Sequence, residues 1–97
     1  MRLEFHPEAD AEYGEILEYL ASDSVISAEK FDDSLHVALL RIKQRPAGGR
    51  PTFRGCRLME VRGFPHRIIY KELADALWIL AVAHTRRRPG YWTARMS

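Results

Sequence analysis

The feature that most constrains the fold of this chain is an uninterrupted run of eight apolar residues, 76–83, bounded by Asp75 and His84. A short apolar run between turn signals is typical of a strand that is buried on both faces. A membrane-spanning helix needs about 20 such residues, so this run is too short to form one. We therefore expect residues 76–84 to form a central strand of a sheet.

Two helical patterns precede this strand. Apolar residues recur every three or four positions in two stretches between residues 9 and 42, as on the buried face of an amphipathic helix. Pro7 suits the first turn of a helix, and Pro46 disfavours a helical residue before it. Asp23 or Ser24 can cap a second helix, so the two helices are joined by about two residues. They must then form an antiparallel hairpin.

The remaining segments are predicted to be strands and turns. Arg2-Leu3-Glu4-Phe5 alternates polar and apolar residues as a half-buried strand does, and residues 46–55 have the composition of a loop. Ala74-Asp75 fits a tight hairpin. Three further strands are expected, at residues 56–61, 67–73 and 76–84. Arginines interrupt the first two of these strands, so we expect one face of the sheet to be exposed and cationic.

Together these segments predict an α+β fold with the order β-α-α-β-β-β. An antiparallel sheet should pack against the N-terminal helical hairpin, and a short C-terminal segment should follow the last strand. A length of 97 residues matches one domain, so residues 1–97 are expected to form a single domain.

The net charge of +2 conceals a division along the chain. Residues 1–40 hold two basic and ten acidic residues, whereas residues 41–72 hold nine basic and two acidic residues. Residues 84–97 add four arginines and no acid. Such an asymmetry indicates binding to nucleic acid or to an acidic partner. A basic sheet surface without any ligand remains the alternative.

The C-terminal end of the last predicted strand is the candidate site. His84, three consecutive arginines and two aromatic residues follow the apolar run directly, in the stretch His84-Thr85-Arg86-Arg87-Arg88-Pro89-Gly90-Tyr91-Trp92. Arginine side chains bind phosphate and carboxylate groups, and histidine titrates near neutral pH. The stretch therefore predicts an anion-binding site at a strand end.

Cysteine usage and the lack of an N-terminal apolar run bear on location. Cys56 is the only cysteine, so it cannot form an internal disulfide, and no metal-binding Cys or His spacing occurs. We expect a protein of the cytoplasm that does not enter a membrane, with no metal and no cofactor. The few carboxylates of the second half also show no spacing suited to Mg²⁺.

Two motifs in this sequence, Phe64-Pro65-His66-Arg67-Ile68-Ile69-Tyr70 and the stretch from Ile79 to Trp92, resemble those of the RelE/ParE toxin superfamily of bacterial type II toxin–antitoxin modules. Residues 64–70, Phe-Pro-His-Arg-Ile-Ile-Tyr, are similar to the family's FPYRI.Y strand, with His66 in place of the usual tyrosine. Residues 79–92 are similar to the ILAV.H..R.P.YW ending of ParE-like plasmid stabilisation proteins. The resemblance covers nearly the whole chain, including the Pro-Glu-Ala start of the first helix.

The resemblance implies a growth-inhibiting toxin that a cognate antitoxin neutralises within a toxin–antitoxin hetero-oligomer. ParE-like members of the superfamily poison DNA gyrase without known nuclease chemistry, whereas RelE-like members cleave mRNA on the ribosome. The Arg-Pro-Gly-Tyr-Trp ending and the presence of only three lysines favour the ParE side. A ribosome-dependent mRNA endoribonuclease is the second interpretation. A non-toxic binding protein that retains the fold is the third.

The residues that could act differ between these interpretations. Metal-free RNA cleavage needs a general base, a general acid and cations for the developing phosphate charge. On the RelE-like interpretation the catalytic candidates are His84, Arg67, Arg87 and Tyr91, with His66 and Tyr70 as further acid–base options. The candidates for anion or partner binding are Arg57, Arg62, Arg67, Arg86 and Arg88. Structural roles, such as cross-strand ion pairing of Arg67 and core packing of Tyr91 and Trp92, remain open for each.

Overall fold

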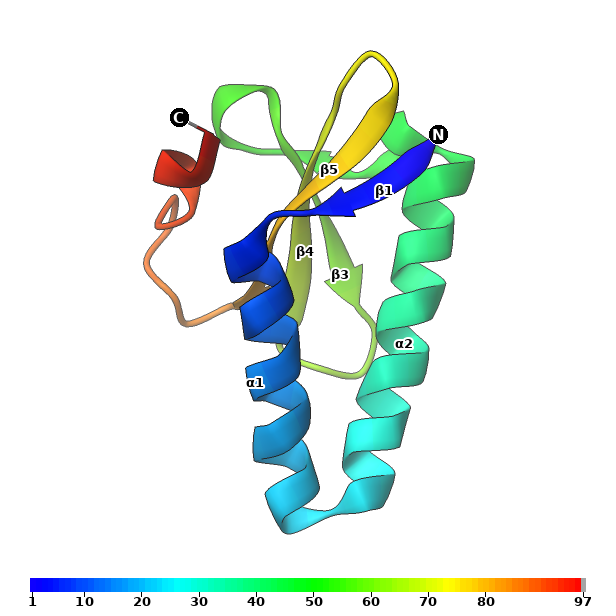
Figure 1. Cartoon of the computed structure of the whole chain (residues 1–97), viewed down its shortest axis with the longest axis vertical. Coiled ribbons are helices and arrows are strands. Elements are labelled where there is room, and N and C mark those ends of the chain that lie inside the picture. The colour runs from blue at the N-terminus through cyan, green and yellow to red at the C-terminus, as the bar shows by residue number, and fades with distance from the viewer. Residues whose placement is uncertain (97) are drawn as a thin grey trace.

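The chain folds into a five-stranded sheet with two long helices packed side by side against one face (Figure 1). The computed structural model describes residues 1–96. The helices and strands are, in chain order, β1 (Arg2–Phe5), α1 (Pro7–Asp23), α2 (Val25–Gln44), β2 (Arg50–Pro51), β3 (Arg57–Val61), β4 (His66–Glu72) and β5 (Ala76–His84). Short 3₁₀ helices occur at Pro46–Gly48, Phe53–Gly55 and Thr93–Met96. The α+β fold class and the helical hairpin are thus confirmed.

Residue Ser24 makes the tight connection between the two helices possible. Its backbone N–H donates to Leu20 O at 2.8 Å and closes α1, while its Oγ accepts from Ser27 N at 3.2 Å and caps α2. Its extended backbone, at φ −156° and ψ 120°, reverses the chain between the helices. One residue thereby ends α1 and begins α2, as the capping preference of serine predicts.

The strand order is β1-β5-β4-β3-β2, and it corrects the expectation of a purely antiparallel sheet. The strands from β2 to β5 are antiparallel, but β1 pairs with β5 in parallel, with Leu3 opposite Leu77. No short turn joins β1 to β5, because both helices and three strands lie between them in sequence. Their relative direction therefore depends on where the helical hairpin returns the chain and not on local turn geometry.

Both faces of the sheet are covered, which corrects the expectation of an exposed cationic face. The helices cover one face, where Phe31, Leu35 and Ile42 of α2 are fully buried. The other face carries a second buried cluster, which consists of Cys56, Leu58, Ile69, Leu80, Ala81, Ala83 and Trp92. Trp92 comes from the C-terminal segment, which therefore packs against this face. Since β4 and β5 are buried on both sides, their apolar residues do not alternate with polar ones.

The loop over residues 46–55 is held against the sheet by one tyrosine. The Tyr70 hydroxyl donates to Pro46 O at 2.7 Å and accepts from Gly49 N at 3.0 Å. Burial raises the pKa of Tyr70, although the Gly49 N–H acts in the opposite sense. The same loop contains the short edge strand β2 and two 3₁₀ turns. In residues 1–96, no helix is both long and apolar enough to cross a membrane.

Candidate functional site

The structure brings the four catalytic candidates together around one small cavity at the end of β5. Arg67 of β4 faces Ala83 across the sheet, His84 ends β5, and Arg87 and Tyr91 follow in the C-terminal segment. All four line a cavity of about 120 Å³ on the sheet face opposite the helices. We call this cavity the arginine pocket and define its polar wall as Thr52, Arg67, His84, Thr85, Arg87, Arg88 and Tyr91.

Arg67 and Arg87 form no ion pair with a carboxylate among residues 1–96. The guanidinium of Arg87 lies over the Tyr91 ring, 3.9 Å from its centroid, in a cation–π contact. The Nε atom of Arg67 is buried and has no hydrogen-bond partner among residues 1–96. Among the residues that the structure describes, no acidic one lines the pocket, and the local charge of this lining is therefore positive.

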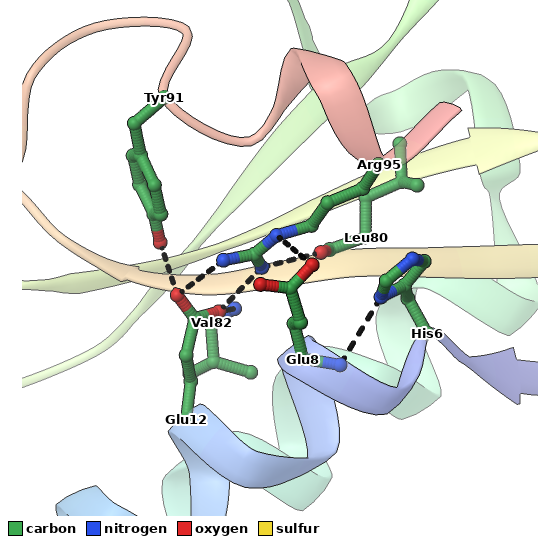
Figure 2. A network of polar contacts seen from close by, with 7 residues as sticks. All are labelled: His6, Glu8, Glu12, Leu80, Val82, Tyr91 and Arg95. Atoms are coloured by element: carbon green, nitrogen blue, oxygen red, sulfur yellow. Dashed lines mark hydrogen bonds and ion pairs between the residues drawn. The ribbon is translucent and has the colours of Figure 1, made fainter. Parts of the chain in front are cut away.

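Tyr91 is engaged in a structural network next to the pocket (Figure 2). Its hydroxyl donates to Glu12 Oε2 at 2.6 Å. Burial is the main reason that the pKa of Tyr91 lies well above its ordinary value, and the hydrogen bond to the Glu12 carboxylate raises it further. Tyr91 thus keeps its proton, which is engaged in the hydrogen bond to a carboxylate of α1, so this hydroxyl is a poor general acid or base at neutral pH.

Glu12 and Arg95 form the centre of this network and were not among the residues that the sequence indicated. The Arg95 guanidinium donates to both Glu12 oxygens at 2.8 and 2.9 Å, and also to Leu80 O at 2.8 Å. The Glu12 carboxylate additionally accepts from Val82 N at 3.0 Å. Burial opposes ionisation of Glu12, but the hydrogen bonds from Arg95, Tyr91 and Val82 outweigh it and lower its pKa. No spacing rule could pair residues that stand 83 positions apart.

The same network completes the free edge of β5. β1 faces only Ala76 to Ile79, and the described chain places no strand beside the rest of β5 on that side. Glu12 and Arg95 bind the edge groups Val82 N and Leu80 O, as Figure 2 shows. Two side chains thus take the place of part of a neighbouring strand and tie the C-terminal segment to α1.

His84 and His66 form a pair at the end of the sheet. Their ring centroids are 5.0 Å apart in an edge-to-face arrangement, and His84 Nδ1 accepts from Arg86 N at 3.0 Å. His66 Nδ1 is buried and has no hydrogen-bond partner within residues 1–96, and the His66 ring also packs edge-on against Phe31. Burial, followed by the neighbouring His84, lowers the pKa of His66. The His66 side chain therefore packs as part of the core, and its imidazole ring is neutral near pH 7.

A second and larger cavity lies on the helix side of the same strand end. It has a volume of about 370 Å³ and is mainly apolar. Its apolar wall, which we call the apolar groove, consists of Ile16, Tyr19, Leu20, Phe64, Pro65 and Val82. Tyr19 is 77 % exposed at its margin. His84 and Arg87 line both cavities, so the strand end separates an apolar groove from the arginine pocket.

The remaining anion-binding candidates are dispersed. Arg88 lines the arginine pocket, whereas Arg62 and Arg86 are exposed outside it. Arg57 donates from Nη1 to Gly49 O at 2.9 Å and supports the loop over residues 46–55. Within residues 1–96, no group of three or more His, Cys, Asp or Glu side chains is placed to hold a metal ion.

Comparison with known proteins defines first a fold class and then a family. A solved structure described as "Chromosomal ParDE TA system from P. aeruginosa" has the same fold, with a TM-score of 0.75 at 19% identity. The match covers 87% of this chain and 95% of that chain. The chain thus shares its two-helix, five-strand fold with that structure.

The family follows from the sequence match. Residues 3–89 match the family described as "ParE toxin of type II toxin-antitoxin system, parDE". This chain belongs to the ParE toxin family. The resemblance to the RelE/ParE superfamily is thereby confirmed. A comparison with curated proteins gives no significant match.

Proposed function

We propose that this ParE-family toxin arrests growth in the cytoplasm by poisoning DNA gyrase, and that a cognate antitoxin neutralises it. One observation favours poisoning over RNA cleavage. The Tyr91 hydroxyl donates a hydrogen bond to Glu12, and burial together with this bond raises the pKa of Tyr91. The pocket is therefore rich in cations, and His84 is the remaining acid–base candidate among its described lining residues. Such a site suits binding better than acid–base chemistry.

The apolar groove supports antitoxin binding. An amphipathic peptide could bury apolar side chains against Ile16, Leu20 and Phe64, with Tyr19 at the margin. Acidic residues of the same peptide would face His84 and Arg87 at the groove's end. The toxin and its antitoxin would then form a hetero-oligomer.

The gyrase proposal is tested with the purified chain, DNA gyrase and a supercoiled plasmid. We expect gyrase-dependent double-strand breaks to accumulate when the reaction is stopped with a denaturing detergent. Expression of the chain alone should arrest growth and leave transcripts intact. Intact, normally supercoiled plasmid at saturating toxin would contradict the proposal. Normal growth at high expression would indicate a non-toxic binding protein instead.

Antitoxin binding is tested with two exposed apolar residues on different helices. Tyr19→Asp should weaken antitoxin binding at least about tenfold, because it places a charge at the margin of the groove. Val37→Asp makes the same kind of change on α2, at a side chain that is 50 % exposed and outside the groove. Calorimetric titration of each variant with antitoxin measures the difference. Equal affinities for the two variants would remove the groove from the interface.

A ribosome-dependent endoribonuclease is the second candidate, because Arg67, His84, Arg87 and Tyr91 do line one pocket. This activity would produce transcript cuts at codon boundaries in translating ribosomes. It would also be lost in His84→Ala and Arg67→Ala. Growth arrest without such cuts, together with gyrase-dependent DNA breaks, would reject it.

A further inference from the structure

The outward side of α2 carries apolar side chains that the fold leaves uncovered. Helix α2 forms one long side of the molecule (Figure 1), and its Val37 and Leu40 are half exposed. These two residues stand three positions apart, so they lie on the same face of the helix. Neither lines the apolar groove or the arginine pocket. We call the stripe that consists of Asp33, Val37, Leu40 and Arg41 the outer face of α2.

Two opposite charges flank Val37 at equal distances. Asp33 lies four residues before it and Arg41 four residues after it, so the three side chains share one ridge of the helix. None of the ion pairs in residues 1–96 includes Asp33 or Arg41. The two stand too far apart to pair with each other along one helix, where pairs form at three or four positions. A second helix that crosses at Val37 could pair both.

The neighbouring carboxylate behaves differently. Asp32 accepts a hydrogen bond from the Tyr13 hydroxyl of α1 and also lies 3.6 Å from His36 Nδ1. It therefore helps to hold the two helices together, whereas Asp33 is exposed on the outer face. The dipole of α2 does not account for Asp33 either, because its effect is confined to the first turn, and that turn holds no acid.

The charge of α2 changes sign along its length. Residues 25–34 hold one basic and three acidic residues, whereas residues 41–45 hold three basic and no acidic residues. Two copies of α2 side by side in the same direction would bring like charges together. In opposite directions, the acidic part of each copy lies against the basic part of the other. A twofold axis produces this match twice, because each contact is repeated in the other half of the interface.

We propose that the outer face of α2 is a self-association surface, on which two copies of this chain pack antiparallel about a twofold axis at Val37. Val37 contacts its counterpart, and Leu40 extends the apolar contact on either side. Asp33 of each copy pairs with Arg41 of the other. A single helix pair buries less than the ~1,200 Å² of a standard interface, so the dimer is weak and depends on concentration.

This dimer leaves the other two surfaces accessible. None of the residues of the outer face lines the apolar groove, and none lines the arginine pocket. Each copy can therefore still bind an antitoxin or a target. The proposal goes beyond gyrase poisoning and antitoxin binding, and it can fail while they hold.

Self-association is measured by analytical ultracentrifugation of the purified full-length chain from micromolar to millimolar concentration. The average mass should rise from one copy toward two. Val37→Asp should weaken self-association at least about tenfold, because it places two carboxylates against each other at the axis. Val25→Asp is the matched control, since Val25 is an exposed valine of α2 outside the outer face. It should leave the dissociation constant unchanged.

Exchanging the charges tests the pairing directly. Asp33→Arg and Arg41→Asp should each weaken self-association at least about tenfold, because each variant brings like charges into contact across the axis. An equimolar mixture of the two single variants should dimerise again, since every charge then meets an opposite one. The double variant Asp33→Arg/Arg41→Asp should also dimerise. Thermal denaturation checks that each variant is folded.

Cross-linking tests the direction of the helices. Val37→Cys should form a disulfide between two copies under mild oxidation, because position 37 meets itself at the axis. Ile26→Cys should not, since the antiparallel order separates the two positions by about 33 Å along the helix pair. The native Cys56 is buried and does not compete. Equal cross-linking at both positions would exclude the antiparallel arrangement.

Three further results would overturn the proposal. These are a constant mass of one copy up to millimolar concentration, equal losses in Val37→Asp and Val25→Asp, or no recovery in the mixture of folded charge variants. Titration with antitoxin separates this proposal from the previous one. Val37→Asp should abolish the dimer and keep its antitoxin affinity. A parallel loss of antitoxin affinity would instead assign the outer face of α2 to the antitoxin interface.

Discussion

At the scale of single residues, Glu12 links distant parts of the chain through its carboxylate. It receives hydrogen bonds from Arg95, Tyr91 and Val82, and thereby joins α1, β5 and the C-terminal segment. The side chains of Glu12 and Arg95 are only 13 % and 9 % exposed. Removal of one charge would leave the other without its counter-ion in a poorly solvated place.

We therefore expect Glu12→Gln to lower the free energy of unfolding by about 2–4 kcal/mol, near the range for breaking a mostly buried ion pair. Chemical denaturation at pH 7 measures this loss. Glu15→Gln removes the same charge one helical turn further along α1, where Glu15 is exposed and makes no ion pair among residues 1–96. It should change stability by less than about 0.5 kcal/mol. Equal effects of both variants would contradict the role given to Glu12.

The stability loss caused by Glu12→Gln should depend on pH in a definite direction. The pKa of Glu12 is lower in the folded chain than its ordinary value of 4.5, so the carboxylate stabilises the fold when it is ionised. This contribution is fully present above pH 4.5 and is lost as the pH falls through the folded-state pKa. The stability gap between the native chain and Glu12→Gln should therefore narrow in acid. A gap that widens below pH 4.5 would contradict this assignment.

At the scale of elements, two glycines show how differently the same residue type is used. Gly14 lies within α1, and an added Cβ would meet nothing within 4 Å. Gly49 follows the first 3₁₀ helix, and its added Cβ would overlap the Tyr70 hydroxyl and lie 2.9 Å from Leu58 O. Gly49 thus permits the close approach of the loop to β3 and β4, whereas Gly14 only reduces the helix propensity of α1.

The two substitutions to alanine should have opposite signs. Gly14→Ala should stabilise the chain by about 0.5–1 kcal/mol, because alanine restricts the unfolded chain and favours the helix. Gly49→Ala should destabilise it by about 1–3 kcal/mol, because the Tyr70 hydroxyl must move and lose its bonds to Pro46 O and Gly49 N. Thermal unfolding of both variants provides the comparison. A neutral Gly49→Ala would mean that the loop is not held by this contact.

At the scale of the whole molecule, the C-terminal segment turns a two-layer arrangement into a sheet covered on both faces. Trp92 is 3 % exposed and packs with Cys56, Leu58 and Leu80 on the face opposite the helices. Met96 Sδ lies 3.5 Å from Cys56 Sγ. Burial raises the pKa of the Cys56 thiol, so its reactivity reports whether this segment is in place.

We expect Trp92→Ala to cost about 3–5 kcal/mol, since it leaves a large cavity in the second core cluster. It should also make Cys56 react faster with a thiol reagent under native conditions. Phe53→Ala is the comparison, because Phe53 neighbours Trp92 but is 50 % exposed. It should cost less and leave Cys56 protected. Unchanged thiol reactivity in Trp92→Ala would show that the segment does not shield the sheet.

Local physical chemistry made most elements predictable. The bounds of β1 and the end of α2 before Pro46 follow from alternation and from proline stereochemistry. The helical hairpin follows from two amphipathic patterns separated by a cap at Ser24. The arginines and His84 at the end of β5 were also visible, because they directly follow the apolar run.

Only the tertiary structure decided which distant residues contact one another. The parallel pairing of β1 with β5, the bonds between Glu12 and Arg95, and the position of Trp92 over the far face all join the two ends of the chain. No periodicity encodes such contacts, because they depend on how the helical hairpin and the sheet pack. The grouping of Arg67 with Arg87 and Arg88, and the exclusion of Arg86, likewise result from register and turn geometry. The sequence by itself determined that cations gather near one strand end, and the packing decided which of them share a pocket.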